Sequence, residues 1–298
     1  MIAVAETGAV SSRGSALRAV LPTLTERRPL GVSGLSVSPL CFGLVPDPRL
    51  VPAAFDMGLN FFFLTADLHW PLYEGLRRGL EMLLERRPSI RDEIVVAVVS
   101  YLDQPMFQYL QFGEVLASVR GLGRVDVLVA GAIPHQPSLQ ARQPSLQSAR
   151  AAGVHGSHAI GASYHDRPTA LQAMNEDALD VHYIRLNAGH PGARTDLFPA
   201  LQTGRRGLIY NFTSMLGRVT PARFAELNLG PSCWLPSATD YYRYVLTNAA
   251  VDGLLCAPRT MDELTALEGC LRAAPLTPED LVYMEWLSAI ANPAYFSN

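Results

Sequence analysis

The sequence contains no lysine, because all 24 of its basic residues are arginine. Without lysine the chain has no ε-amine for a Schiff base and no lysine that could relay a proton. Both of these roles are excluded for any reaction that this protein performs.

Cysteine is also scarce, and no two cysteines form a CxxC pair. Each of the four lies among apolar residues, which is typical of buried free thiols in a reducing compartment. This predicts a cytoplasmic location. The four are Cys41, Cys233, Cys256 and Cys270.

Long apolar runs and clusters of charge are absent as well. No stretch approaches 18 apolar residues, so we expect no membrane span, and a net charge of −3 without an arginine cluster argues against nucleic acid as a partner. HExxH and other ligand spacings are missing, so no metal site is predicted. The expected partner is a small molecule.

Short apolar runs alternate with amphipathic stretches from residue 40 onward, the pattern of parallel strands joined by crossover helices. Eight such strands in succession favour a closed α/β barrel, the (β/α)8 or TIM barrel, over an open sheet. Residues 28–298 are expected to form this single domain, and residues 1–27 a flexible tail. The predicted strands are Leu40–Leu44, Asn60–Leu64, Ile94–Ser100, Val125–Ile133, His158–Ser163, Val181–Leu186, Gly207–Asn211 and Gly253–Ala257.

Helices are expected in the gaps between these strands. A local duplication, QPSLQAR followed by QPSLQSAR at Gln136–Arg150, carries a proline in each copy and predicts a lengthened loop with a short helix. The predicted helices are Pro48–Met57, Leu72–Arg87, Phe112–Gly121, Ser145–Gly153, Pro168–Asp177, Asp196–Thr203, Ala238–Asn248 and Met261–Ala273.

The stretch RPLGVSGLSVSPLCFGL at Arg28–Leu44 resembles the opening hairpin of the aldo-keto reductases. Further segments agree with this family in the same order, from AAFDMGLNFFFLTAD at Ala53–Asp67 to YYRYVLTNAAVDGLLCAPRTMDEL at Tyr241–Leu264. The resemblance implies a (β/α)8 barrel with a short N-terminal β-hairpin, whose relatives reduce carbonyls with NADPH at the carboxyl ends of the strands.

The resemblance also implies four catalytic positions, an aspartate, a tyrosine, a lysine and a histidine. In this chain the corresponding residues are Leu64, His69, Val99 and Gly131. A tyrosine can donate a proton near neutral pH only when its phenolate is stabilised, whereas histidine, with a pKa near 6.5, needs no lysine. His69 is therefore either an acid or base in its own right, or a remnant packed against Trp70.

The nicotinamide contacts of the family are only partly matched. Ser163 and Tyr164 stand where a serine and an asparagine are expected, and Tyr183 stands where a glutamine is expected. Arg259 and Thr260 begin a predicted helix that could bind the cofactor's phosphate. NADP(H) is thus implied by the family, but its binding is not established by these residues.

Several polar and aromatic residues should gather at the rim of the barrel, where such enzymes place their chemistry. Three functions remain open: non-redox acid/base catalysis such as isomerisation, elimination or cyclisation; NADPH-dependent carbonyl reduction with a rebuilt site; or non-catalytic binding. For the first, the predicted catalytic residues are His69, Asp67 and Tyr101, and the predicted pocket residues are Trp70, His135, Tyr164, His165, Asn187 and Tyr210.

Overall fold

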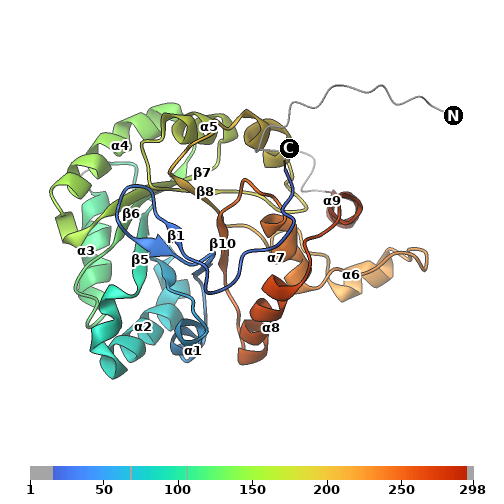
Figure 1. Cartoon of the computed structure of the whole chain (residues 1–298), viewed down its shortest axis with the longest axis horizontal. Helices are drawn as coiled ribbons and strands as arrows, with labels where there is room; N and C mark the ends of the chain where they lie inside the picture. The colour runs from blue at the N-terminus through green and yellow to red at the C-terminus, as the bar shows by residue number, and fades with distance from the viewer. Residues whose placement is uncertain (1–15, 68, 106, 294–298) are drawn as a thin grey trace.

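The eight predicted strands close into one parallel barrel (Figure 1). The computed structural model describes residues 16–67, 69–105 and 107–293. Each strand lies within two residues of its predicted position at either end, so the barrel expected from the sequence is confirmed. The strands, in barrel order, are β3 (Leu40–Phe42), β4 (Phe61–Thr65), β5 (Val95–Ser100), β6 (Val127–Ile133), β7 (Ala159–Tyr164), β8 (Val181–Ile184), β9 (Leu208–Asn211) and β10 (Gly253–Cys256).

Helices surround the barrel, as Figure 1 shows. Two of them, α6 and α9, were not predicted, and the segment after β8 forms a π-helical turn and a 3-10 turn instead of the expected α-helix. The helices are α1 (Leu50–Asp56), α2 (Glu74–Arg86), α3 (Gln108–Ser118), α4 (Gln136–Ala151), α5 (Arg167–Glu176), α6 (Pro221–Glu226), α7 (Ala238–Leu246), α8 (Met261–Arg272) and α9 (Pro278–Ala291), with short turns η2 (Trp70–Tyr73), η3 (Pro88–Asp92), η4 (Val154–Gly156), η5 (Ala193–Leu197) and η6 (Phe198–Ala200).

Aromatic side chains fill the interior of the barrel. The ring centroids of Phe61 and Tyr210 are 5.3 Å apart, and those of Phe63 and Tyr183 are 5.0 Å apart, both pairs edge to face. Because side chains alternate along a strand, residues 61 and 63 share the inner face of β4 and Leu64 lies on the other face. This packing makes the barrel a solid core with a floor for a site at its carboxyl end.

A repeated contact ties neighbouring strands together at the amino end of the barrel. Asp126 stands just before β6; its backbone N–H donates to the carbonyl of Val96, and its carboxylate accepts the N–H of Val96 at 2.8 Å. The same exchange joins Asp180 to Ile160 before β8 and Asp252 to Ile209 before β10. Before β4, the side-chain oxygen of Asn60 accepts the N–H of Ser38, and the N–H of Asn60 donates to the hydroxyl of Ser38. Every second strand therefore begins with a side chain that orders the strand before it.

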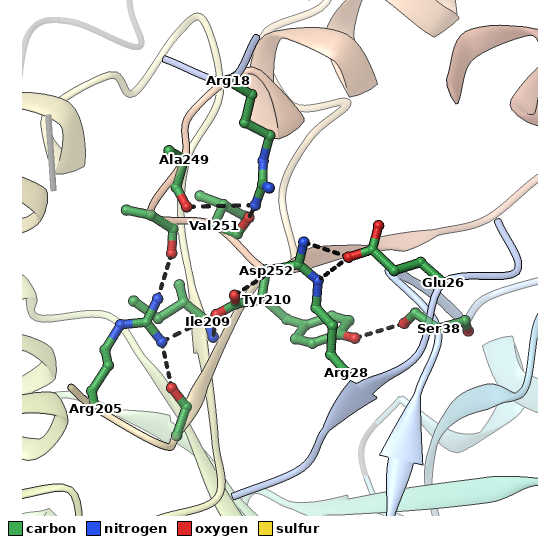
Figure 2. Close-up of polar contacts among 12 residues, drawn as sticks. Arg18, Glu26, Arg28, Ser38, Arg205, Ile209, Tyr210, Ala249, Val251 and Asp252 are labelled. Atoms are coloured by element: carbon green, nitrogen blue, oxygen red, sulfur yellow. Dashed lines mark hydrogen bonds and ion pairs between the residues drawn. The ribbon is translucent and has the colours of Figure 1, made fainter. Parts of the chain in front are cut away.

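Arginines neutralise the three buried carboxylates of this end. Figure 2 shows Arg28 and Arg205 on either side of Asp252, at 2.7 and 3.1 Å, with Arg18 donating to the carbonyl of Val251. Arg28 belongs to the predicted hairpin, which consists of β1 (Arg28–Pro29) and β2 (Ser36–Val37) paired antiparallel. The hairpin is thus fixed across the amino end, opposite the carboxyl ends of the strands.

The segment before the hairpin does not behave as a tail. Residues 1–15 lie outside the described part of the chain, but Leu21 and Leu24 are buried and Leu17 forms a bridge with Asn248. Burial of these leucines removes apolar surface from water, which explains why the segment packs. The expected tail is therefore shorter than residues 1–27.

The duplicated segment forms one continuous helix, α4, instead of the expected long loop. Its first proline lies in the first turn, where no N–H is needed, and Pro144 lies inside the helix. The fully buried Arg142 holds the helix to the barrel by donating to the carbonyls of Gly131 and Ser100, at 2.8 and 2.6 Å. These tertiary contacts offset the local cost of the proline.

Candidate functional site

A cavity of about 510 Å³ opens at the carboxyl ends of the strands. Loops after β3, β4, β5, β7 and β9 contribute to its wall, and Phe63 and Tyr183 of the barrel interior form its floor. Four of the residues predicted from the sequence as site residues line it, namely His69, Tyr101, Ser163 and His165.

His69 and Tyr101 form the most reactive part of the wall. His69 precedes the turn η2, its side chain is exposed, and its ring meets that of Tyr101 edge to face with 5.1 Å between centroids. Burial, and secondarily Asp67, raises the pKa of Tyr101 to about 12. Tyr101 is therefore a neutral phenol over the physiological range and can donate a hydrogen bond, and the exposed imidazole of His69 lies beside it.

Asp67 does not line the cavity, but it holds the backbone beside this pair. Its carboxylate accepts the backbone N–H of Tyr101 at 2.6 Å and the hydroxyl of Thr65 at 2.7 Å. Both oxygens are thus occupied by groups that fix the loop. Asp67, which was predicted to be catalytic, therefore helps to position Tyr101 through this contact.

Of the four positions implied by the family resemblance, three hold an apolar side chain or none, and the fourth holds His69. Leu64 is paired with Val98 and lies on the outer face of β4, so it is Phe63 that faces the cavity. A Cβ on Gly131 would lie 2.6 Å from Cδ1 of Tyr101 and 2.7 Å from Cγ2 of Val99. The ring of Tyr101 therefore fills the space that a side chain at residue 131 would need.

Tyr183 adds an unpartnered polar group to the cavity floor. Its hydroxyl is buried and has no hydrogen-bond partner in the described part of the chain. Leaving a buried hydroxyl unsatisfied costs free energy, so a ligand that accepts its hydrogen bond gains affinity. Burial raises the pKa of this phenol, which keeps it a donor.

Three of the predicted pocket residues are structural. The hydroxyl of Tyr164 contacts Nδ1 of His182 at 3.0 Å on the outside of β7, away from the cavity. Tyr210 donates to the carbonyl of Ser38 at the amino end of the barrel. The buried Asn187 donates to the hydroxyl of Thr213 at 3.1 Å and so holds the loop after β8. Strand direction and alternation explain the first two: each tyrosine lies on the correct strand but on the wrong face or at the wrong end.

His135 and Trp70 also lie outside the cavity wall. His135 caps α4, where its side chain accepts the N–H of Ser138. Trp70 is 45% exposed and stacks against Arg77, whose guanidinium carbon is 5.2 Å from the ring centroid. Neither side chain approaches His69 on the cavity side.

The sequence reasoning missed much of the wall between β9 and β10. Phe212 to Leu216 follow a predicted strand directly, and their position after its carboxyl end was the available signal. Tyr242 and Cys256 complete this side.

A second cavity of about 550 Å³ adjoins the first and shares Met215, Leu216, Tyr242 and Ala257 with it. Arg259 and Glu263 line it, and Nη2 of Arg259 is 3.0 Å from the Glu263 carboxylate. Thr260 caps α8, because its hydroxyl accepts the backbone N–H of Glu263. A phosphate of NADP(H) bound at this arginine and helix start would therefore have to compete with the carboxylate of Glu263.

In the part of the chain that the structure describes, no group of three or more histidine, cysteine or acidic side chains is arranged to hold a metal ion. Within the same residues, no helix has the length and apolar character needed to cross a bilayer.

The fold is similar to that of solved aldo-keto reductases. The holo form of aldo-keto reductase AKR11C1 from Bacillus halodurans matches with a TM-score of 0.64 and 16% identity, over 88% of this chain and 96% of that chain. Its apo form matches with a TM-score of 0.61 and 17% identity over the same shares. PA4992 from Pseudomonas aeruginosa, assigned to the aldo-keto reductases, matches with a TM-score of 0.61 and 18% identity over 85% and 98%.

No protein-family model and no curated protein matches the sequence. The resemblance predicted from the sequence is confirmed at the level of the fold. The roles of individual residues depend on the geometry described above.

Proposed function

We propose that this protein catalyses a non-redox acid/base reaction on a small organic substrate at the cavity lined by His69 and Tyr101. The observation that carries the proposal is the edge-to-face contact of these two rings in the wall of a cavity floored by an unpartnered tyrosine hydroxyl. A base and two neutral donors are the groups that proton transfer next to a carbonyl requires.

A proton transfer of this kind needs no cofactor. His69 removes a proton from the carbon next to a substrate carbonyl, and the negative charge that develops on the carbonyl oxygen accepts hydrogen bonds from Tyr101 and Tyr183. Return of the proton from His69 to a different carbon gives an isomer. In elimination the enolate instead forms a carbon–carbon double bond as the leaving group departs from the neighbouring carbon with the electron pair of its bond, and that group takes the proton held by His69.

The substrate is proposed to have a largely apolar body. Leu44, Leu72 and Leu216 line the cavity mouth although they are 43%, 61% and 42% exposed. They come from three loops far apart in the sequence. Covering such side chains by an apolar ligand would remove their surface from water and so favour binding.

Deuterium exchange tests the proposal without knowledge of the natural substrate. Small cyclic ketones such as cyclohexanone and 2-methylcyclohexanone are incubated with the protein in D2O, and NMR follows loss of the α-protons. We expect exchange above the buffer rate, lowered about 100-fold by His69→Ala and about tenfold by Tyr101→Phe. His158→Ala, at an exposed histidine beside the amino end of β7, is the control.

Unchanged exchange in His69→Ala would remove that residue from the mechanism. Tight binding of the ketones with no exchange above buffer would favour the non-catalytic alternative over catalysis.

Carbonyl reduction remains the second candidate, because the two adjoining cavities share four residues and together offer room for an extended ligand. This candidate requires NADPH to bind despite the Arg259–Glu263 pair. A fluorescence titration tests it, and no response at millimolar NADPH would count heavily against it.

A further inference from the structure

We propose that Arg185, together with His165, recognises an anionic group on the substrate, so that the substrate class is a small organic acid such as a carboxylate. This inference rests on the proposed function for its location, since His165 lines the same cavity. It concerns binding and does not depend on proton transfer by His69.

Arg185 lies directly after β8, at the carboxyl end of the barrel. Its Nη2 is 3.4 Å from Nδ1 of His165, in a contact open to solvent. A guanidinium can only donate, so Nδ1 of His165 is the acceptor and the imidazole next to the cavity is neutral. In the described residues the guanidinium makes no other hydrogen bond, so donors of its fork remain for a ligand that approaches along His165.

This arginine has no acidic partner. In the described residues, no carboxylate lies within ion-pair distance of Arg185, and its buried Nε has no hydrogen-bond partner. By contrast, Arg167 on the neighbouring helix is paired with Asp196 at 2.7 Å. An unpaired guanidinium beside a cavity is a preferred receptor for a carboxylate, which it binds through two parallel hydrogen bonds.

Arg185 supplies the positive field at this part of the rim. Burial first, and then Arg185, lowers the pKa of His165; the pKa of His190 is lowered by burial, Arg185 and Arg167. Both imidazoles are therefore neutral at pH 7.5, and the guanidinium of Arg185 is the cation that a bound anion would meet. An uncharged ligand would gain nothing from the same field.

The backbone that carries Arg185 is held firmly. The N–H of Leu186, the next residue, donates to the side-chain oxygens of Asn211 and Thr213 at 2.8 and 3.2 Å. Preorganisation of this kind lowers the entropic cost of ligand binding.

Benzoate and benzamide test the proposal, because they have nearly the same size and differ in charge. Calorimetric titration of the full chain at pH 7.5 should show benzoate binding about ten- to hundredfold more tightly than benzamide. Arg185→Gln should bring the two within about twofold, and Arg185→Lys should restore part of the preference because the charge returns without the planar fork.

Two further variants test whether the preference for benzoate arises at Arg185. Arg218→Gln changes an arginine that lines the second cavity and should keep the preference for benzoate. His69→Ala should also keep it, so loss of catalysis there with retained benzoate binding separates this inference from the proposed function. Equal affinities in the wild type, an unchanged preference in Arg185→Gln, or its loss in Arg218→Gln would each overturn the proposal.

Discussion

The ring of Tyr101 lies against the backbone of Gly131 so closely that no side chain fits between them. A Cβ on Gly131 would be 2.6 and 2.8 Å from Cδ1 and Cε1 of Tyr101. Asp67 holds the backbone of this tyrosine, and Cγ2 of Val99 on β5 would lie 2.7 Å from the same Cβ. Gly131 therefore determines where the proposed donor points.

Gly131→Ala should displace Tyr101, destabilise the fold and impair ketone exchange. Overpacking of this kind costs about 1 to 3 kcal/mol, measurable by urea unfolding. Gly269→Ala is the matched control, because nothing lies within 4 Å of its added methyl group on α8 and alanine favours a helix. The double variant Tyr101→Ala/Gly131→Ala should lose less unfolding free energy than the sum of the losses in the two single variants, because the clash is gone. Strictly additive losses would contradict the steric account.

The barrel could be predicted from the sequence because the patterns that mark its strands and helices are local. Eight apolar runs separated by amphipathic stretches fix the order of strands, and the hairpin motif was recognisable from Arg28 onward. Four of the residues predicted for the site line the cavity, because side chains at or just after the carboxyl end of a strand lie near the rim.

The failures arose where a single residue's direction depends on tertiary packing. Tyr164 and Tyr210 lie on the predicted strands, but one points outward to His182 and the other toward Ser38 at the far end. The continuous helix through Pro144 requires the contacts of Arg142, which no local pattern shows. The Arg185–His165 contact joins two loops 20 residues apart and equally needed the fold.

The carboxylate of Asp126 should contribute strongly to stability. It is fully buried and binds Arg91 at 2.9 Å, Arg124 at 2.8 Å and the N–H of Val96 at 2.8 Å. Asp126→Ala removes the buried carboxylate that two arginines share and leaves the N–H of Val96 without its side-chain acceptor, and it should lower the free energy of unfolding by about 3 to 5 kcal/mol. Asp56→Ala breaks an exposed pair with Arg87 and should leave the unfolding midpoint nearly unchanged. Similar losses in both variants would contradict a special role for the amino-end carboxylates.

His182 should make the fold sensitive to acid. Burial, and secondarily Arg205, lowers its pKa to about 3, with Asp177 opposing, whereas the unfolded chain has a histidine pKa near 6.5. Below pH 6.5 the unfolded state takes up a proton that the folded state excludes, so stability is lost as pH falls from about 6.5 toward 3. The loss approaches about 1.4 kcal/mol per pH unit.

Urea unfolding of the wild type and His182→Gln at pH 7.5, 6.5, 5.5 and 4.5 measures this contribution. The stability difference between the two proteins should shrink steadily below pH 6.5, because the variant lacks the titrating ring. His158→Gln, at an exposed histidine, should follow the wild type at every pH. A constant difference between wild type and His182→Gln would mean that His182 has the same pKa in the folded and the unfolded protein, which would contradict this account.

The pair of Arg259 and Glu263 should decide whether the second cavity accepts a phosphate. Glu263 binds both the guanidinium and the backbone N–H of Arg259, at 3.0 and 2.8 Å, so a phosphate must compete with a carboxylate of the same chain. Glu263→Gln removes that charge and keeps the size of the side chain. NADPH affinity, followed by fluorescence titration, should then increase about tenfold, the gain expected from a charge-assisted hydrogen bond. NADH, which lacks the 2′-phosphate, should show no comparable gain. Tight binding of NADPH by the wild type, unaffected by Glu263→Gln, would mean that the phosphate lies elsewhere and would favour the reductase over the acid/base enzyme.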